Sequence, residues 1–168
     1  YDFARVLKNN KQFKKSEIYY TKVLNLIDRQ HYLYPNASDG RGIVRDKLGK
    51  WDTAEKDFMN SLAASSNQPY VINYLAYSWI EKGINIERSL KMLEKAIRLK
   101  KNDGYITDSY GWAFYKLKKY KKTKKYLELA VRLMPLDPTV NDHYGDSLWM
   151  NNQFIQARYY WSYVLKLK

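Results

Sequence analysis

Apolar residues recur at intervals of three and four along the chain, and no segment alternates with the period of a strand. Leu90, Leu93 and Ile97 show this spacing in one segment, and Leu127 and Ala130 show it in another. Such spacing gathers apolar side chains on one face of an α-helix. The sequence therefore predicts an all-α protein.

A longer pattern recurs on top of the helical one. A small residue is followed, always at the same intervals, by an aromatic residue and then by a second small residue. The sets are Gly42, Trp51 and Ala54; Gly111, Tyr120 and Thr123; and Gly145, Phe154 and Ala157. The step from Gly111 to Gly145 is 34 residues, a period typical of a helix–turn–helix repeat.

Alignment on these markers predicts a single array of five units. The units are 1–34, 35–68, 69–103, 104–137 and 138–168. The first residue is Tyr1 rather than Met, and neither end carries a polar capping helix, so we expect the chain to be a fragment of a longer protein. Ends without caps would otherwise pair with another chain.

Small residues are expected where helices approach closely. In this interpretation a Gly or Ala on the first helix of a unit faces an Ala, Ser or Thr on the second, and the aromatic residue starts the second helix. The predicted repeat-packing positions are Gly42, Ala54, Ala76, Ala96, Gly111, Ala130, Gly145 and Ala157. Asp137 followed by Pro138 is typical of a helix N-cap and first helical position.

The repeats resemble those of the tetratricopeptide repeat (TPR) family. Residues 108–120, continuing to Ala130 and Pro135, follow the family consensus, as do residues 141–149 with Phe154 and Ala157. The resemblance implies a right-handed superhelical solenoid that scaffolds protein complexes, with first helices lining a concave groove for a peptide or partner helix. Residues 73–79 and 141–149 are similar to C-terminal arrays of long bacterial TPR proteins, which are often exported. Arg41 departs from the pattern at a normally apolar place, where we expect looser packing.

The groove positions implied by the resemblance are rich in carboxylates and aromatic rings. The predicted groove residues are Asn73, Tyr77, Asp108, Trp112, Tyr115, Asp142, Asp146 and Trp149, with His143 at the edge. Carboxylates pair with cations, and aromatic faces hold them by cation–π contact. We therefore predict a protein or peptide partner with basic or aromatic groups. The alternative is that Asp108 and Asp142 are first-turn acids that favour the helix dipole.

The positive charge of the chain suggests a second hypothesis about what it binds. The chain has 30 Lys and Arg against 17 Asp and Glu, a net charge of +13. The densest cationic run lies between Lys116 and Lys125, and its predicted surface comprises Lys118, Lys119, Lys121, Lys122, Lys124 and Lys125. This outer surface is either an electrostatic site for nucleic acid or anionic membrane, or an ordinary solvated face. Lysine dominates the run, whereas arginine is the better phosphate clamp, which makes nucleic acid the weaker partner.

Several kinds of chemistry have no support in the sequence. With no Cys, the chain has no disulfide, zinc–thiolate site or Cys nucleophile. No apolar run approaches the roughly 18 residues of a membrane span. His143 with Asp142 and Asp146 is more typical of a polar groove wall than of a metal site. No phosphate-binding loop or nucleophile–base pattern occurs, so we predict a non-enzyme without cofactor or metal.

Overall fold

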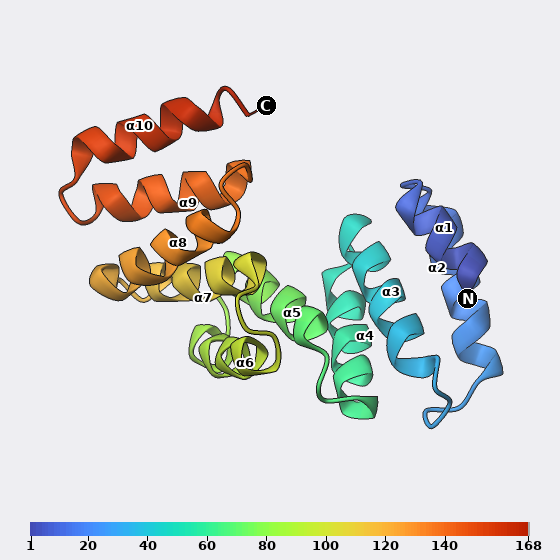
Figure 1. Ribbon diagram of the computed structural model, residues 1–168. Helices are drawn as coiled ribbons and strands as arrows, with labels where there is room; N and C mark the ends of the chain where they lie inside the picture. The colour runs from blue at the N-terminus through green and yellow to red at the C-terminus, as the bar shows by residue number, and fades with distance from the viewer. Residues whose placement is uncertain (168) are drawn as a thin grey trace. The chain divides into compact units, whose positions relative to one another are not determined.

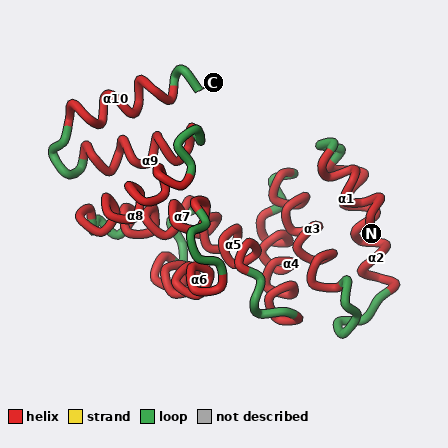
Figure 2. The backbone as a smooth tube through the Cα atoms, in the orientation of Figure 1, coloured by secondary structure: helices red, strands yellow, loops and turns green. Residues whose placement is uncertain are grey.

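The computed structural model describes residues 1–167, which form ten α-helices joined by short turns and contain no strand (Figures 1 and 2). Contacts divide the chain into two compact units, Tyr1–Val71 and Ile72–Lys168. The helices are α1 (Asp2–Asn9), α2 (Phe13–Leu26), α3 (Tyr34–Lys47), α4 (Trp51–Ala64), α5 (Pro69–Glu81), α6 (Ile86–Leu99), α7 (Gly104–Lys116), α8 (Tyr120–Leu133), α9 (Pro138–Trp149) and α10 (Phe154–Val164). The all-α prediction is confirmed.

Helix starts follow the chemistry that the sequence indicates. Trp51, Tyr120 and Phe154 each begin the second helix of a pair. The carboxylate of Asp137 accepts a hydrogen bond from the Val140 N–H at 3.0 Å, and Asp103 caps α7 in the same way. These caps satisfy amide groups that the first helical turn leaves without a partner.

The eight predicted repeat-packing residues are all buried. The three glycines among them, however, face larger side chains than expected. A Cβ placed on Gly111 would lie 2.7 Å from Leu127 Cδ2, and one on Gly145 would lie 2.5 Å from Trp161 Nε1. Gly42 lies against Phe58 in the same manner. Each glycine thus makes room for a bulky residue of the second helix. That residue lies one helical turn after the small residue that was expected to face the glycine.

In residues 1–71, an ion network lies where the sequence predicted looser packing. Arg41 donates to both carboxylate oxygens of Asp57, at 2.9 and 2.7 Å, and Arg45 donates to the same carboxylate at 2.9 Å. Arg45 also bonds Glu17, which pairs with Lys50 at 2.7 Å. Since Asp57 has a side-chain exposure of only 2%, the expectation of loose packing at Arg41 is wrong: the arginine neutralises a buried acid.

Asp39, on α3, has an unfavourable environment for its charge. Burial raises the pKa of its carboxyl from 3.8 to about 6, and nearby Lys8 only partly opposes this rise. When folding raises the pKa of a carboxyl, the protein becomes less stable as the pH rises from the unfolded-state pKa to the folded-state pKa. Asp39 therefore destabilises residues 1–71 increasingly between about pH 4 and pH 6.

We expect Asp39→Asn to raise the free energy of unfolding at pH 7 by about 2 kcal/mol, and to change it little at pH 4. Urea unfolding at both pH values measures this difference. The control is Asp52→Asn, which removes an exposed first-turn acid of α4 and should slightly lower stability at pH 7. A gain that is equal at both pH values would contradict the assignment.

Candidate functional site

The candidate site lies in residues 72–168, where α5, α7 and α9 each contribute side chains. Asp108 and Asp142 are both the fifth residue of their helix, and neither α7 nor α9 has an acid in its first turn. Interpreting Asp108 and Asp142 as first-turn acids is therefore wrong. The carboxylates at the helix starts belong to the N-caps, Asp103 and Asp137.

Aromatic rings of α7 and α9 stack together at the centre of the site, and a tilted ring of α5 lies beside them. The centroid of the Trp112 ring lies 3.9 Å from that of His143 and 4.4 Å from that of Tyr115, with 10° between the planes in each case. Tyr77 approaches His143 at 6.4 Å between ring centroids. The stack thus joins α5, α7 and α9 through ring contacts that favour one arrangement of side chains.

Buried polar contacts hold the stack in place. His143 Nδ1 lies 3.0 Å from both carboxylate oxygens of Asp108, and both side chains are almost fully buried. Trp112 Nε1 donates to Glu81 Oε1 at 2.7 Å. These bonds fix the orientation of two rings, because each of these ring nitrogens has one defined partner.

The cationic side chain of Lys116 already occupies part of this surface. The Lys116 ammonium lies 5.1 Å from the centroid of the Trp112 ring and 3.6 Å from Glu81 Oε1. Glu81 and Lys116 lie at groove positions of the repeat but were not among the predicted site residues. Their pairing depends on α5 and α7 meeting, which periodicity within each helix does not reveal.

Two further carboxylates lie beside the stack on α9. Asp142 is exposed and Asp146 is half-buried. Burial raises the pKa of the Asp146 carboxyl, and the charge of Asp142 raises it further. A hydrogen bond with Trp161 opposes the rise, as do the charges of His143 and Lys116. This part of the site therefore has an excess of negative charge that an added cation would relieve.

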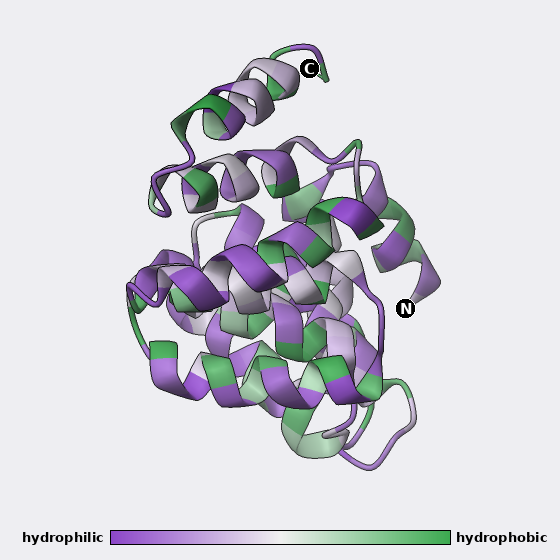
Figure 3. Cartoon of the chain, turned by 60° about the vertical axis from the view of Figure 1, so that its left-hand side comes forward, coloured by the Kyte–Doolittle hydropathy of each residue, from purple (hydrophilic) through white to green (hydrophobic). Residues whose placement is uncertain are grey.

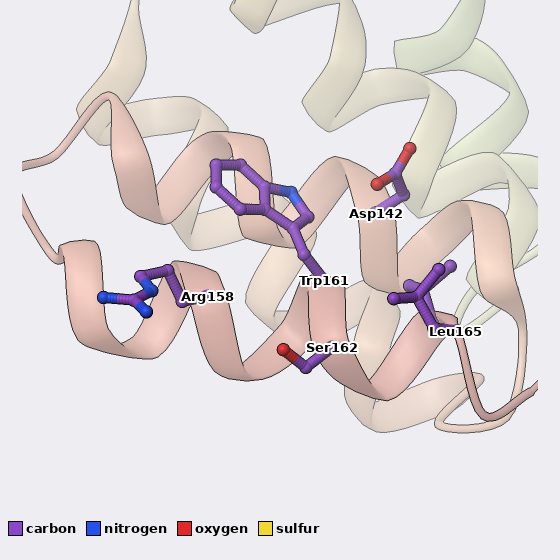
Figure 4. Close-up of a pocket in the computed structure, with 6 residues that line it drawn as sticks. Asp142, Arg158, Trp161, Ser162 and Leu165 are labelled. Carbon is purple, nitrogen blue, oxygen red and sulfur yellow. The ribbon is translucent and has the colours of Figure 1, made fainter.

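A hollow adjoins Asp142 between α9 and α10 (Figure 4). Its volume is about 350 Å³, and its lining combines Asp142 and Arg158 with Trp161, Ser162, Val164 and Leu165. Trp161 was not predicted as a site residue, although it lies where Phe58 and Leu127 lie in other repeats. Among the described residues, no group of His, Cys, Asp or Glu is arranged to hold a metal ion.

Asn73, Trp149 and the predicted basic residues make up the rest of the predicted site. Asn73 on α5 is partly buried, and its Oδ1 atom lacks a hydrogen-bond partner. Trp149 ends α9 and packs against Phe154 at 4.6 Å and Trp161 at 5.5 Å between ring centroids. Of the predicted basic surface, Lys124 is partly buried, and the exposed members are Lys118, Lys119, Lys121, Lys122 and Lys125.

Solved structures with the same fold cover almost the whole chain. PilF of Pseudomonas aeruginosa aligns with a TM-score of 0.82 and 18% identity over 99% of this chain and 74% of its own. MamA of Desulfovibrio magneticus RS-1 aligns with a TM-score of 0.81 and 16% identity over 99% of this chain and 91% of its own. YrrB, a TPR protein with an unusual peptide-binding site, aligns with a TM-score of 0.74 and 16% identity over 99% of this chain and 84% of its own.

These likenesses define the class of protein by its fold: the chain has the fold of a TPR solenoid, as its repeat markers predicted. No family model matches the sequence, and no curated protein matches it. In the part of the chain that the structure describes, each helix is too short or too polar to cross a bilayer.

Proposed function

We propose that the chain is a non-catalytic interaction module that binds a peptide or partner helix through the acidic, aromatic surface of α5, α7 and α9. The observation that carries the proposal is the carboxylate pair Asp142 and Asp146 beside the stacked rings of Trp112 and Tyr115. A Lys or Arg side chain from the partner would neutralise this pair. The exposed carboxylate of Asp142 would make the first contact.

The internal contact of Lys116 supports this choice of ligand. Its ammonium already lies over an aromatic ring and beside a carboxylate, which is the arrangement that the partner's cation would adopt near Tyr115 and Asp146. Cation–π contacts of this kind contribute about 0.5–2 kcal/mol. Asp108 and His143 have a different role in the proposal, because their mutual pairing orients the ring stack rather than contacting the partner.

The hollow beside Asp142 indicates a second residue type in the ligand. Trp161, Val164 and Leu165 offer apolar contact, so an apolar side chain near the basic one would fill the hollow. Arg158 at the rim favours a partner whose flanking residues are neutral or acidic. The proposed ligand therefore combines one basic and one apolar residue within a short segment.

Selection from a phage-displayed random peptide library tests the proposal. We expect the chain to enrich peptides with Lys or Arg next to an apolar residue, and binding to persist in high salt because part of the site is desolvated. Asp142→Asn with Asp146→Asn should lower the affinity for a selected peptide by at least about tenfold, since charge-assisted hydrogen bonds are lost. Asn at position 146 keeps an oxygen that accepts the Trp161 hydrogen bond.

The matched control is Glu94→Gln with Glu128→Gln, which removes the same charge from α6 and α8. This variant should bind the selected peptides as the parent chain does. Peptides without basic residues, or equal binding to all variants, would contradict the proposed site.

A further inference from the structure

The turn between α7 and α8 and the turn between α9 and α10 together form one surface. They line a common hollow of about 540 Å³, to which the first turn contributes Lys118 and Lys119, the start of α8 contributes Lys121 and Lys122, and the second turn contributes Met150. Asn151 Nδ2 donates to the Tyr120 carbonyl at 3.0 Å and so ties the second turn to the start of α8. Basic and apolar side chains therefore lie next to each other.

The exposed face continues along α8 and α10. Position 121 is one repeat before position 155, and position 125 is one repeat before position 159. The α8 positions hold lysines, whereas the α10 positions hold Ile155 and Tyr159, whose exposed fractions are 84% and 66%. Phe154 at the start of α10 is 45% exposed, and this end of the helix has hydrophobic colours in Figure 3.

These positions face solvent in the other repeats too. The residues equivalent to Ile155 are Lys14, Asp52, Glu87 and Lys121, and all of them are exposed although another helix pair follows each. A further repeat after α10 would therefore not be expected to cover Ile155. Exposed aliphatic and aromatic side chains at a solvent-facing position indicate a contact outside the solenoid.

Negative charge is absent from the same segments. Residues 109–127 contain seven lysines and no Asp or Glu, and residues 147–168 contain no acid either. The nearest acid in the sequence after the lysine run is Glu128, which bonds Arg132 at 2.7 Å. The surface is thus cationic on one helix and apolar on the next, and its flanking acid, Glu128, is paired with Arg132.

We infer that this surface docks on an anionic lipid bilayer. Lysines of α8 and its preceding turn would contact headgroup phosphates, while Phe154, Ile155 and Tyr159 would enter the interfacial layer. Basic residues beside exposed apolar ones are the combination that peripheral membrane surfaces use. Nucleic acid is less well matched, because the most exposed apolar side chain of this surface, Ile155, is aliphatic and the lysine run contains no arginine, the better phosphate clamp.

Co-sedimentation with phosphatidylcholine vesicles, with and without phosphatidylserine, tests the inference. We expect binding only when phosphatidylserine is present. Lys118→Gln with Lys121→Gln and Lys122→Gln should weaken binding about a hundredfold. The matched control, Lys14→Gln with Lys15→Gln and Lys22→Gln, removes the same charge from α2 and should have little effect.

The apolar half of the surface needs a separate measurement. Ile155→Ser with Tyr159→Ser should weaken binding about tenfold while leaving the net charge unchanged. Brominated phosphatidylcholine in the anionic vesicles should quench part of the tryptophan fluorescence, and Trp149→Phe should remove most of that quenching. Far-UV circular dichroism checks that each variant keeps its helices.

Three results would overturn the inference: no binding to anionic vesicles, equal loss from both lysine sets, or unchanged binding after Ile155 and Tyr159 are replaced. Fluorescence anisotropy with a labelled single-stranded oligonucleotide tests whether nucleic acid, the rival ligand, binds this surface. If the chain binds the oligonucleotide through these lysines and ignores vesicles, the surface is a nucleic-acid site instead. Asp142→Asn with Asp146→Asn should leave vesicle binding intact, which keeps this test independent of the proposed peptide site.

Discussion

Replacing Asp57 with Ala should lower the free energy of unfolding by about 3–5 kcal/mol, since it leaves two arginines without their buried counter-ion. Arg41 and Arg45 together make three hydrogen bonds to this carboxylate, at 2.7–2.9 Å. Both guanidinium groups are mostly buried, so water cannot replace the lost partner. Urea unfolding followed by far-UV circular dichroism measures the loss, and hydrogen exchange should locate it in α3 and α4.

Two comparisons make this prediction specific. Lys50→Ala removes the outer ion pair with Glu17 and should lower stability by less than about 1 kcal/mol, because the Lys50 side chain is 53% exposed. Replacing Arg41, Arg45 and Asp57 together with apolar residues of similar size should recover most of the loss. If Asp57→Ala were no more harmful than Lys50→Ala, the network would have no special role in stability.

Gly111→Val should lower the free energy of unfolding by about 3 kcal/mol through overpacking in residues 72–168. Any Cβ at this position would lie 2.7 Å from Leu127 Cδ2 and 3.2 Å from the Leu127 backbone nitrogen. Leu127 is fully buried, so neither group can move away cheaply. Val and Gly differ by only about 0.5 kcal/mol in helix propensity, so the loss reports packing rather than backbone preference.

A double-mutant cycle with Leu127→Ala isolates the contact. The single change Leu127→Ala should lower stability by about 2–5 kcal/mol because it leaves a cavity. In that background, Gly111→Val should be much less harmful, since its side chain enters the vacated space. Additive effects of the two changes would show that Gly111 is not required for the close approach of α7 and α8.

The charge distribution separates the two proposed surfaces. The chain has a net charge of +13, yet its ring stack is accompanied by Glu81, Asp142 and Asp146. The lysines of α8 lie on the outward face of a second helix. A basic peptide would therefore be attracted to one surface and an anionic bilayer to the other, and charge variants of one surface should leave the other's ligand bound.

Helix positions were accessible from sequence because they depend on local chemistry. The spacing of apolar residues, the N-cap aspartate before Pro138 and the aromatic residues Trp51, Tyr120 and Phe154 at second-helix starts all act within a few residues of one another. The eight small residues predicted at repeat-packing positions are buried. The packing partners of the three glycines among them were not predicted, because the Cβ direction of each glycine points to a residue one turn further along the facing helix.

The sequence by itself determined the all-α fold and predicted a TPR solenoid, and it placed acidic and aromatic residues on the first helices. Only the tertiary structure decided which of those residues meet. The pairing of His143 with Asp108 and the bond from Trp112 to Glu81 each join two different repeats, whereas the neutralisation of Asp57 by Arg41 joins the two helices of one repeat. Periodicity within one helix specifies a face, whereas these contacts depend on how neighbouring helices cross, which the periodicity of a single helix does not encode.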